Sequence, residues 1–202
     1  MKRGHIYTFV FMVAITAVLV FALAAAYEAF KAPIQDNKAL QEQRAVLYAL
    51  GLDAGLKDSE VAGVYAEKVA EGAIGGVSET AGQKVLAHQE GGQPVAYAVP
   101  FEGAALWGSL RGYLGVKADL SATTGLVFTY QNETPGLGGR IDEEDFKEKW
   151  RGLPLQSGVS LRYSASDPNL PDAVTGATQT SSAVLRTINK VLQDVVFPGE
   201  VK

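Results

Sequence analysis

The stretch Asp172-Ala173-Val174-Thr175-Gly176-Ala177-Thr178-Gln179-Thr180-Ser181-Ser182 places a hydroxyl-rich loop immediately before an apolar periodic segment. The apolar side chains of that segment recur at the spacing of one helix face; they are Val184, Leu185, Ile188, Val191, Leu192 and Val195. A helix is therefore expected to begin inside the stretch, with Thr178, Thr180 and Ser181 as alternative N-cap residues. The loop is either a simple helix cap or an anion site, because free N–H groups at a helix start favour phosphate.

The composition excludes several classes of site. The 202 residues suit one domain with a sizeable core and an extra segment at one end. The absence of cysteine excludes disulfides and thiolate chemistry, and two histidines are too few for a His-rich metal centre. The net charge is −4, and the chain without its basic start is more acidic still, so nucleic acid is not an expected partner.

The uncharged run from Ile6 to Ala26 predicts a membrane partner. At about 1.5 Å per residue, a helix of this length spans the ~30 Å hydrocarbon core of a bilayer. Lys2 and Arg3 precede the run, so the positive-inside rule places residues 1–5 in the cytoplasm. Ala24-Ala25-Ala26 also resembles a signal cleavage site, so a retained anchor and a cleaved signal peptide both remain open. Both interpretations export the domain.

The segments after the run predict an α+β fold. Capping residues and apolar spacing predict helices over 36–51, 58–70 and 142–150. Alternating patterns bounded by Gly, Pro or Asp predict strands at Lys84–His88, Pro94–Pro100, Ser109–Lys117, Leu126–Gln131 and Val159–Tyr163. His88 is expected to be a solvated strand residue and not a ligand. One domain built on an antiparallel sheet with flanking helices follows from this order.

These expectations divide the chain into four parts. A cytoplasmic tail covers residues 1–5 and a single transmembrane anchor covers 6–27. A helical stalk covers 28–57, and the exported domain covers 58–202. The sequence contains no internal repeat and no linker long enough to separate a second domain.

Two further segments look unlike ordinary connections. The first is Gly103-Ala104-Ala105-Leu106-Trp107-Gly108, which is either a hairpin with Trp107 in the core or part of a binding wall. The second is Asn132-Glu133-Thr134-Pro135-Gly136-Leu137-Gly138-Gly139-Arg140. Its glycines allow a ligand to approach the backbone closely, and Pro135 stiffens the loop before them. Leu137, if exposed, would offer an apolar plate to a flat ring.

The sequence lacks the signatures of catalysis. It contains no nucleophile elbow, no P-loop and no dinucleotide-binding fingerprint. Glu133 and Asp172 could pair as carboxylates, but no water-activating partner or metal cluster accompanies them. We therefore expect no catalytic residue and no metal. The glycine loop, the apolar wall and the hydroxyl-rich helix start suit a planar phosphorylated cofactor that supplies the chemistry itself.

With these segments in hand, the chain resembles the FMN-binding family of NqrC and RnfG, membrane-anchored subunits of sodium- or proton-linked redox pumps. Thr175-Gly176-Ala177-Thr178, with Asp172 three residues ahead, matches the family's flavinylation signature, whose last threonine carries FMN as a phosphoester. The segments 133–138 and 106–108 match two further family signatures. The resemblance covers essentially the whole chain, most specifically 95–152 and 170–186.

The NqrC branch is the closer likeness. Residues 7–12, 130–132 and 146–152 look NqrC-like. Two features depart from the pattern: Gly103-Ala104-Ala105 replaces the usual Gly-x-Gly before Leu-Trp, and the chain is shorter than a typical NqrC.

The resemblance implies a cofactor and a set of residues that hold it. FMN is expected as a covalent phosphoester on Thr178, attached by a separate flavin transferase. The other residues expected at the cofactor are Leu106, Trp107, Gly108, Glu133, Thr134, Pro135, Gly136, Leu137, Gly138, Asp172, Thr175, Gly176, Ala177, Thr180 and Ser181.

The resemblance also implies a role. The chain is expected to relay electrons between neighbouring subunits of a Na⁺-translocating NADH:quinone oxidoreductase in the bacterial inner membrane, with its domain on the periplasmic side. Alternatives are an RnfG-type subunit of a ferredoxin:NAD oxidoreductase complex, a stand-alone extracytoplasmic FMN-binding protein, or a non-redox FMN sensor.

Overall fold

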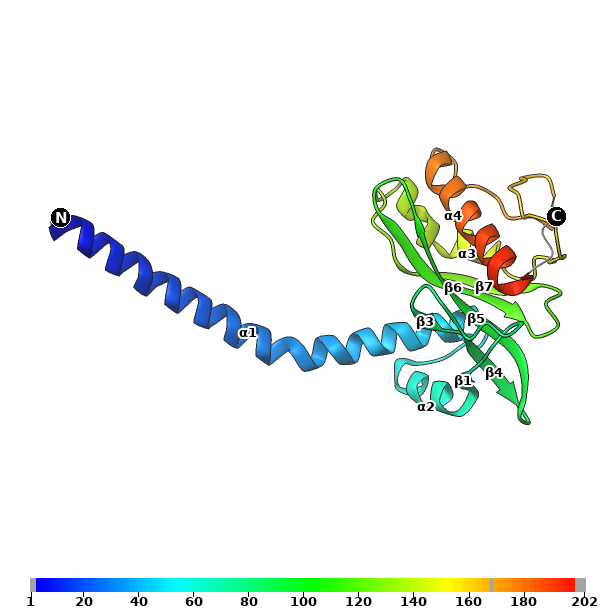
Figure 1. Ribbon diagram of the computed structural model, residues 1–202, viewed down its shortest axis with the longest axis horizontal. Helices are drawn as coiled ribbons and strands as arrows, with labels where there is room; N and C mark the ends of the chain where they lie inside the picture. The colour runs from blue at the N-terminus through cyan, green and yellow to red at the C-terminus, as the bar shows by residue number, and fades with distance from the viewer. Residues whose placement is uncertain (1–2, 168, 199–202) are drawn as a thin grey trace. The chain divides into compact units, whose positions relative to one another are not determined.

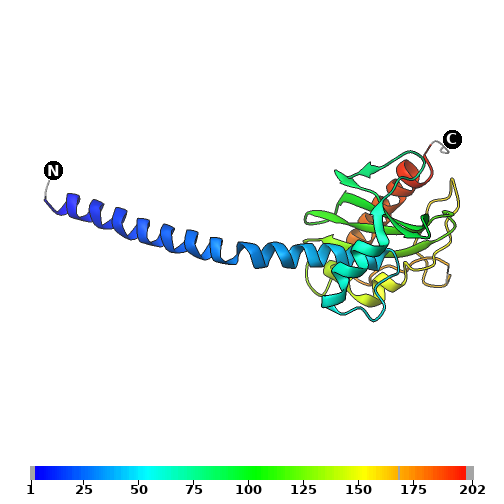
Figure 2. The ribbon, with the colours of Figure 1, turned by 90° about the horizontal axis from the view of Figure 1, so that it is seen from below.

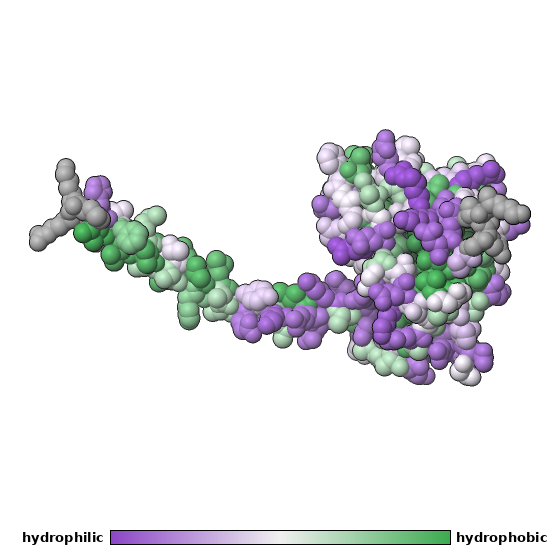
Figure 3. Space-filling view, in the orientation of Figure 1, coloured by the Kyte–Doolittle hydropathy of each residue, from purple (hydrophilic) through white to green (hydrophobic). Residues whose placement is uncertain are grey.

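The computed structural model describes residues 3–167 and 169–198, which divide into two compact units. The first unit ends at Leu40 and consists of the first part of one helix, α1 (Arg3–Ala49). Large apolar side chains from Ile6 to Phe30 are exposed, and Figure 3 shows much of this stretch in hydrophobic green. By its length and composition, this helix could cross a membrane.

One expected helix boundary is wrong. The sequence predicts a new helix at Asp36, but α1 continues through this position and through Pro33. A proline removes one N–H donor and can kink a helix without ending it. Since the residues that follow include good helix formers such as Ala39, Leu40 and Gln41, the helix has no local reason to restart.

The second unit, from Gln41 onward, is built on an antiparallel sheet (Figure 1). The spatial order β1-β4-β5-β6-β7 joins β1 (Val69–Glu71), β4 (Leu86–Glu90), β5 (Gln93–Ala104), β6 (Ser109–Lys117) and β7 (Thr123–Tyr130). A separate small hairpin pairs β2 (Glu79–Thr80) with β3 (Gln83–Lys84). The α+β class and the antiparallel sheet are thus confirmed.

Helices cover both faces of this sheet (Figure 1, Figure 2). One face packs against α4 (Thr178–Val191), which continues as a π-helical turn, η2 (Leu192–Val196), and against α3 (Glu144–Glu148). The other face packs against the end of α1, and Tyr65 of α2 (Asp58–Lys68) joins that cluster. The larger core lies on the α4 face and includes Val99, Phe101, Leu114, Leu126, Trp150, Val184 and Ile188.

Glycines let both helices approach the sheet closely. A Cβ at Gly103 would lie 2.0 Å from Thr187 Oγ1 of α4, and one at Gly115 would lie 1.7 Å from the Ala49 carbonyl oxygen. The glycine that the family pattern places before Leu-Trp thus has a packing role here, because only a residue without a side chain fits beneath α4.

Two sequence expectations fail within the domain. Residues 159–163 form no strand, because the Asn189 side chain of α4 pairs with the Leu161 backbone: Leu161 N–H donates to Oδ1 and Nδ2 donates to the Leu161 carbonyl, both at 2.8 Å. A side-chain amide thus takes the place of a neighbouring strand. His88 is not solvated; it is only 4% exposed within β4, between β1 and β5.

Candidate functional site

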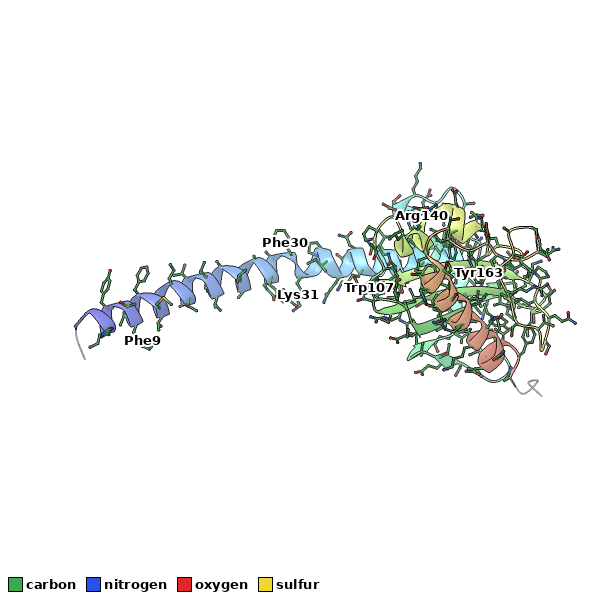
Figure 4. All side chains as sticks on the ribbon, turned by 90° about the horizontal axis from the view of Figure 1, so that it is seen from above. Phe9, Phe30, Lys31, Trp107, Arg140 and Tyr163 are labelled. Atoms are coloured by element: carbon green, nitrogen blue, oxygen red, sulfur yellow. The ribbon has the colours of Figure 1, made fainter. Side chains whose placement is uncertain are left out.

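The tight turn between β5 and β6 presents the first predicted segment. Ala105 N–H donates to the Gly108 carbonyl at 2.8 Å and closes the turn. Leu106 and Trp107 lie at its tip, and Trp107 is 67% exposed (Figure 4). The alternative in which Trp107 packs into the core is therefore wrong. Two large apolar side chains face solvent where a hairpin would ordinarily carry polar residues.

The second segment forms a tight turn after β7. The Thr134 carbonyl accepts N–H donors from Leu137 at 3.1 Å and from Gly139 at 3.0 Å, and Gly136 adopts φ +75°. The turn then becomes a short 3₁₀ helix, η1 (Gly138–Asp142). Leu137 is 51% exposed at its tip, so the condition for an apolar plate is met.

The third segment is the start of α4. The N-cap position is Ala177, so the expectation that Thr178, Thr180 or Ser181 caps the helix is wrong. Thr180 and Ser181 are buried and already bonded: Ser181 Oγ accepts the Val174 N–H at 3.1 Å. Thr178 is the first residue of the helix and is exposed. No side chain of the described residues caps α4, so its first N–H groups are open to an anion.

Glu133 joins the three segments. Its side chain is buried, its Oε1 accepts the backbone N–H of Trp107 at 2.9 Å, and its Oε2 accepts the hydroxyl of Thr180. Gly138 lies against the same carboxylate, because a Cβ there would stand 2.9 Å from Oε2 and 2.5 Å from Thr180 Oγ1. The hairpin turn, the glycine loop and α4 therefore meet at one side chain.

A second contact brings the glycine loop to the hydroxyl-rich loop. Gly176 adopts φ +80°, and a Cβ at this position would lie 4.0 Å from Leu137 Cδ2. Leu137 thus stands beside the turn that leads into Thr178. Gly108 is close to the end of β7 in a similar way, since its Cβ would lie 3.5 Å from that of Asn132.

The remaining predicted residues divide by exposure. Those open to solvent are Gly108, Thr134, Pro135, Gly136, Thr175 and Gly176, whereas Gly138 and Ala177 are buried. Asp172 is half-buried and pairs with Lys149 Nζ at 3.1 Å. Glu133 and Asp172 therefore take separate partners, and the structure gives no support for a carboxylate pair.

Two residues at the site were missed by the sequence reasoning. Lys149 neutralises Asp172, and Tyr163 donates its hydroxyl to the Ser181 carbonyl of α4 at 2.8 Å. Tyr163 also packs edge-on against Trp150, and burial raises the pKa of its hydroxyl. Neither residue belongs to a motif; Tyr163 could not be found from a pattern, because its partner is a backbone carbonyl far along the chain.

The chemistry of the assembled groups fits a flavin mononucleotide. An exposed hydroxyl and open N–H groups at a helix start suit its phosphoryl group. Exposed leucine and tryptophan side chains suit a flat aromatic ring. Among the described residues, no group of three or more His, Cys, Asp or Glu side chains could hold a metal ion. The arrangement can bind and orient a cofactor but offers no nucleophile–base pair.

Comparison with known proteins agrees with this chemistry. Residues 106–193 match the sequence model of the family described as "FMN-binding domain". The chain thus carries an FMN-binding domain. The matched residues contain the hairpin tip, the glycine loop and the start of α4, so all three segments belong to the FMN-binding domain.

Relatives of two kinds match part of this chain. The chain is 30% identical over 112 residues to the C subunit of the Na⁺-translocating NADH-quinone reductase of Yersinia pestis, covering 52% of this chain and 42% of that protein. It is 28% identical over 114 residues to the G subunit of a proton-translocating ferredoxin:NAD⁺ oxidoreductase complex of Clostridium ljungdahlii, covering 56% and 60%. The matches thus span less than two thirds of each relative.

The fold also has a solved counterpart. The crystal structure of NqrC from Shewanella oneidensis superposes with a TM-score of 0.62 at 23% identity, covering 75% of this chain and 90% of that one. The fold of this chain is therefore similar to that of the NqrC crystal structure.

Proposed function

We propose that this chain is an electron-carrier subunit that holds FMN as a covalent phosphoester on Thr178, within an NqrC-type Na⁺-translocating NADH:quinone oxidoreductase. The observation that carries the proposal is the exposed Thr178 hydroxyl at the open start of α4, beside the apolar tips of two loops. The sequence likeness to NqrC subunits supports the choice of complex.

Burial distinguishes Thr178 from neighbouring hydroxyls. Thr180 and Ser181 are 2% and 1% exposed, and both hydroxyls have protein partners. A flavin transferase could not reach either residue without unfolding the start of α4. Thr175 is exposed but lies in the turn before the helix. Only Thr178 combines exposure with a place among the open N–H groups.

The start of α4 then holds the phosphoester. The group keeps one negative charge after attachment, and the helix dipole stabilises such a charge by about 0.3–1 kcal/mol at a surface. N–H groups of the first turn donate to its oxygens. We expect the transferase to supply the general base that deprotonates the Thr178 hydroxyl during attachment. The chain itself then needs no base at this position.

The two loop tips hold the ring. Leu106, Trp107 and Leu137 form the apolar surface, and Gly136 and Gly138 allow the backbone to approach it. When bound, FMN supplies the redox chemistry, accepting an electron from a reduced neighbouring subunit and passing it to an oxidised one. The chain itself provides position and electrostatics, and a covalent link prevents loss of the cofactor outside the cytoplasm.

The N-terminal part of α1 provides the location. We propose that residues 6–27 are retained as a membrane anchor, with residues 1–5 in the cytoplasm and the FMN-binding domain on the periplasmic side. Partners are then the other subunits of the complex. The ferredoxin-linked relative favours a second candidate, an RnfG-type subunit with the same cofactor and site.

The attachment site is testable by co-expression with a flavin transferase. In-gel fluorescence under denaturing conditions and intact mass should show one covalent FMN on the wild type and none on Thr178→Val. Thr129→Val is the matched control, because it makes the same change at an exposed threonine of β7 that is not among the expected cofactor residues, and it should retain the flavin. An unflavinylated wild type would refute the proposal, and flavin on Thr178→Val would refute the site.

A further inference from the structure

We propose that the buried carboxylate of Glu133 lowers the reduction potential of the FMN and, as a positioning residue, sets the wall against which the ring lies. This inference rests on the function proposed above. It concerns the acidic side chain of Glu133, which connects its own segment to the hairpin turn and to α4 and which the electron-carrier role alone leaves unexplained.

The geometry places this carboxylate directly behind the loop tips. Its two oxygens accept the Trp107 N–H and the Thr180 hydroxyl, so it connects the hairpin turn to α4. Gly138 covers it from the glycine loop with no side chain between, because a Cβ there would meet Oε2 at 2.9 Å. The carboxylate therefore contacts the backbone of Trp107 directly and lies against Gly138, the residue next to Leu137.

The charge of Glu133 is not cancelled by a cation. Its side chain is buried with 6% of the residue exposed, yet none of the ion pairs among residues 3–167 and 169–198 includes it. The nearby basic residues Arg140 and Lys149 are engaged elsewhere, with Glu143 and Asp172. Two hydrogen bonds satisfy the carboxylate without neutralising it, and burial weakens solvent screening of its field.

A fixed negative charge beside a redox group opposes reduction. Each electron that enters the flavin from a donor adds one negative charge to the ring unless a proton follows. The field of Glu133 raises the free energy of that reduced form relative to the oxidised form, by the same Coulombic effect that shifts the pKa of neighbouring acids. No bond to Glu133 forms or breaks, so its contribution is purely electrostatic and positional.

The test is a reductive titration of the flavinylated full-length chain, with dithionite as the electron donor. Glu133→Gln removes the charge and keeps the size, and should raise the midpoint potential of the FMN. Glu79→Gln is the matched control, since Glu79 is exposed on β2 and the same loss of charge there should leave the potential unchanged. A Glu133→Gln potential equal to that of the wild type would overturn the inference.

A second variant tests the field of Glu133 while its carboxylate is retained. Thr180→Val keeps the carboxylate and removes the hydroxyl that partly offsets its charge, so the midpoint potential should fall. An unchanged or raised potential in Thr180→Val would contradict the proposed field. This variant decides the matter if Glu133→Gln does not fold.

The positioning role has its own readout in the protein without flavin. Glu133→Gln can keep both contacts, because its amide oxygen can accept the Trp107 N–H and its amide nitrogen can donate to the Thr180 hydroxyl. Glu133→Ala removes both contacts and leaves the Trp107 N–H and the Thr180 hydroxyl without this partner. Acrylamide should quench the fluorescence of exposed Trp107 more strongly in this variant, whereas Trp150, which is fully buried, contributes an unquenched background. Unaltered quenching would refute the positioning role. A different result would refute the proposed function, namely the absence of covalent flavin on the wild-type chain.

Discussion

The two faces of the sheet differ in how their edges meet solvent. The face toward the end of α1 is closed by a dense polar network, in which Arg151 Nη1 donates to the Tyr48 carbonyl at 3.3 Å and Nη2 to Asp53 at 3.0 Å. The Arg151 guanidinium also lies 4.0 Å from the centre of the Tyr48 ring. The α4 side instead ends in exposed apolar tips around the start of the helix.

This difference separates stability from function. Where groups interlock, as around Arg151, truncation leaves buried partners unsatisfied and costs stability. Where apolar side chains stand exposed, as at Trp107, truncation costs little stability and acts on whatever the surface binds. We therefore expect substitutions on the two sides to differ in kind.

The largest loss of stability is expected from Gly115→Val on the α1 side. A Cβ at this position would lie 1.7 Å from the Ala49 carbonyl oxygen and 2.2 Å from Thr124 Oγ1, so α1 must move away from the sheet. Overpacking of this kind costs about 3 kcal/mol in the free energy of unfolding. Urea unfolding measures it, with Gly63→Ala in α2 as the control, where a Cβ meets nothing within 4 Å. Equal stability of the two variants would refute the close contact.

Arg151→Ala should have the next largest effect. It removes the donors to Tyr48, Thr124 and Asp53 together, at an expected cost of about 2 kcal/mol. Arg162→Ala removes the same charge from an exposed position and should change the free energy of unfolding by less than about 0.5 kcal/mol. Indistinguishable unfolding curves for the two variants would mean that the network does not stabilise the domain.

Tyr163→Phe probes the α4 side through pH. Burial raises the pKa of Tyr163 above its ordinary value of about 10, so the folded state binds this proton more tightly than the unfolded state. The corresponding stability is present below about pH 10 and is lost as the pH rises toward the folded-state pKa. The variant should lose about 1 kcal/mol at pH 7 through the missing hydrogen bond to Ser181. Its stability should also fall less steeply in alkaline solution; an equal slope would contradict the assignment.

The smallest change in stability is expected from Trp107→Ala, below about 0.5 kcal/mol, because the side chain is 67% exposed. Covalent attachment should persist, but the absorption spectrum of the flavin should shift as the ring loses an aromatic neighbour. An unchanged spectrum would mean that Trp107 does not contact the flavin ring, and that the exposed loop tip has no role in holding the cofactor.

Much of the fold could be predicted from local pattern. The bounds Ser109–Lys117 of β6 are those predicted, because alternation and glycine punctuation are local signals. The strand expected at 159–163 failed because alternation cannot reveal whether a partner strand exists; here Asn189 takes its place. His88 was misjudged for a related reason, since strand order decides which residues are covered.

The candidate site was predictable as three segments but not as one structure. The family signature named Thr178 as the attachment residue. The sequence could not show that Thr180 and Ser181 are buried, because their burial depends on how α4 packs against the sheet. The meeting of Trp107, Thr180 and Gly138 at Glu133 links positions up to 73 residues apart through a single carboxylate. Such convergence has no signature along the chain.

The shared carboxylate of Glu133 also bears on how this domain can change over evolutionary time. Residues that share a partner do not contribute additively to stability. A substitution in the hairpin tip alters the effect of a substitution at Thr180, so the two positions should show epistasis although 73 residues separate Trp107 from Thr180 in the sequence. Moving the hydroxyl-rich loop alone into another protein would therefore transfer Thr178 without Glu133, which positions the residues around it. We expect the three segments to be retained or lost together in evolution.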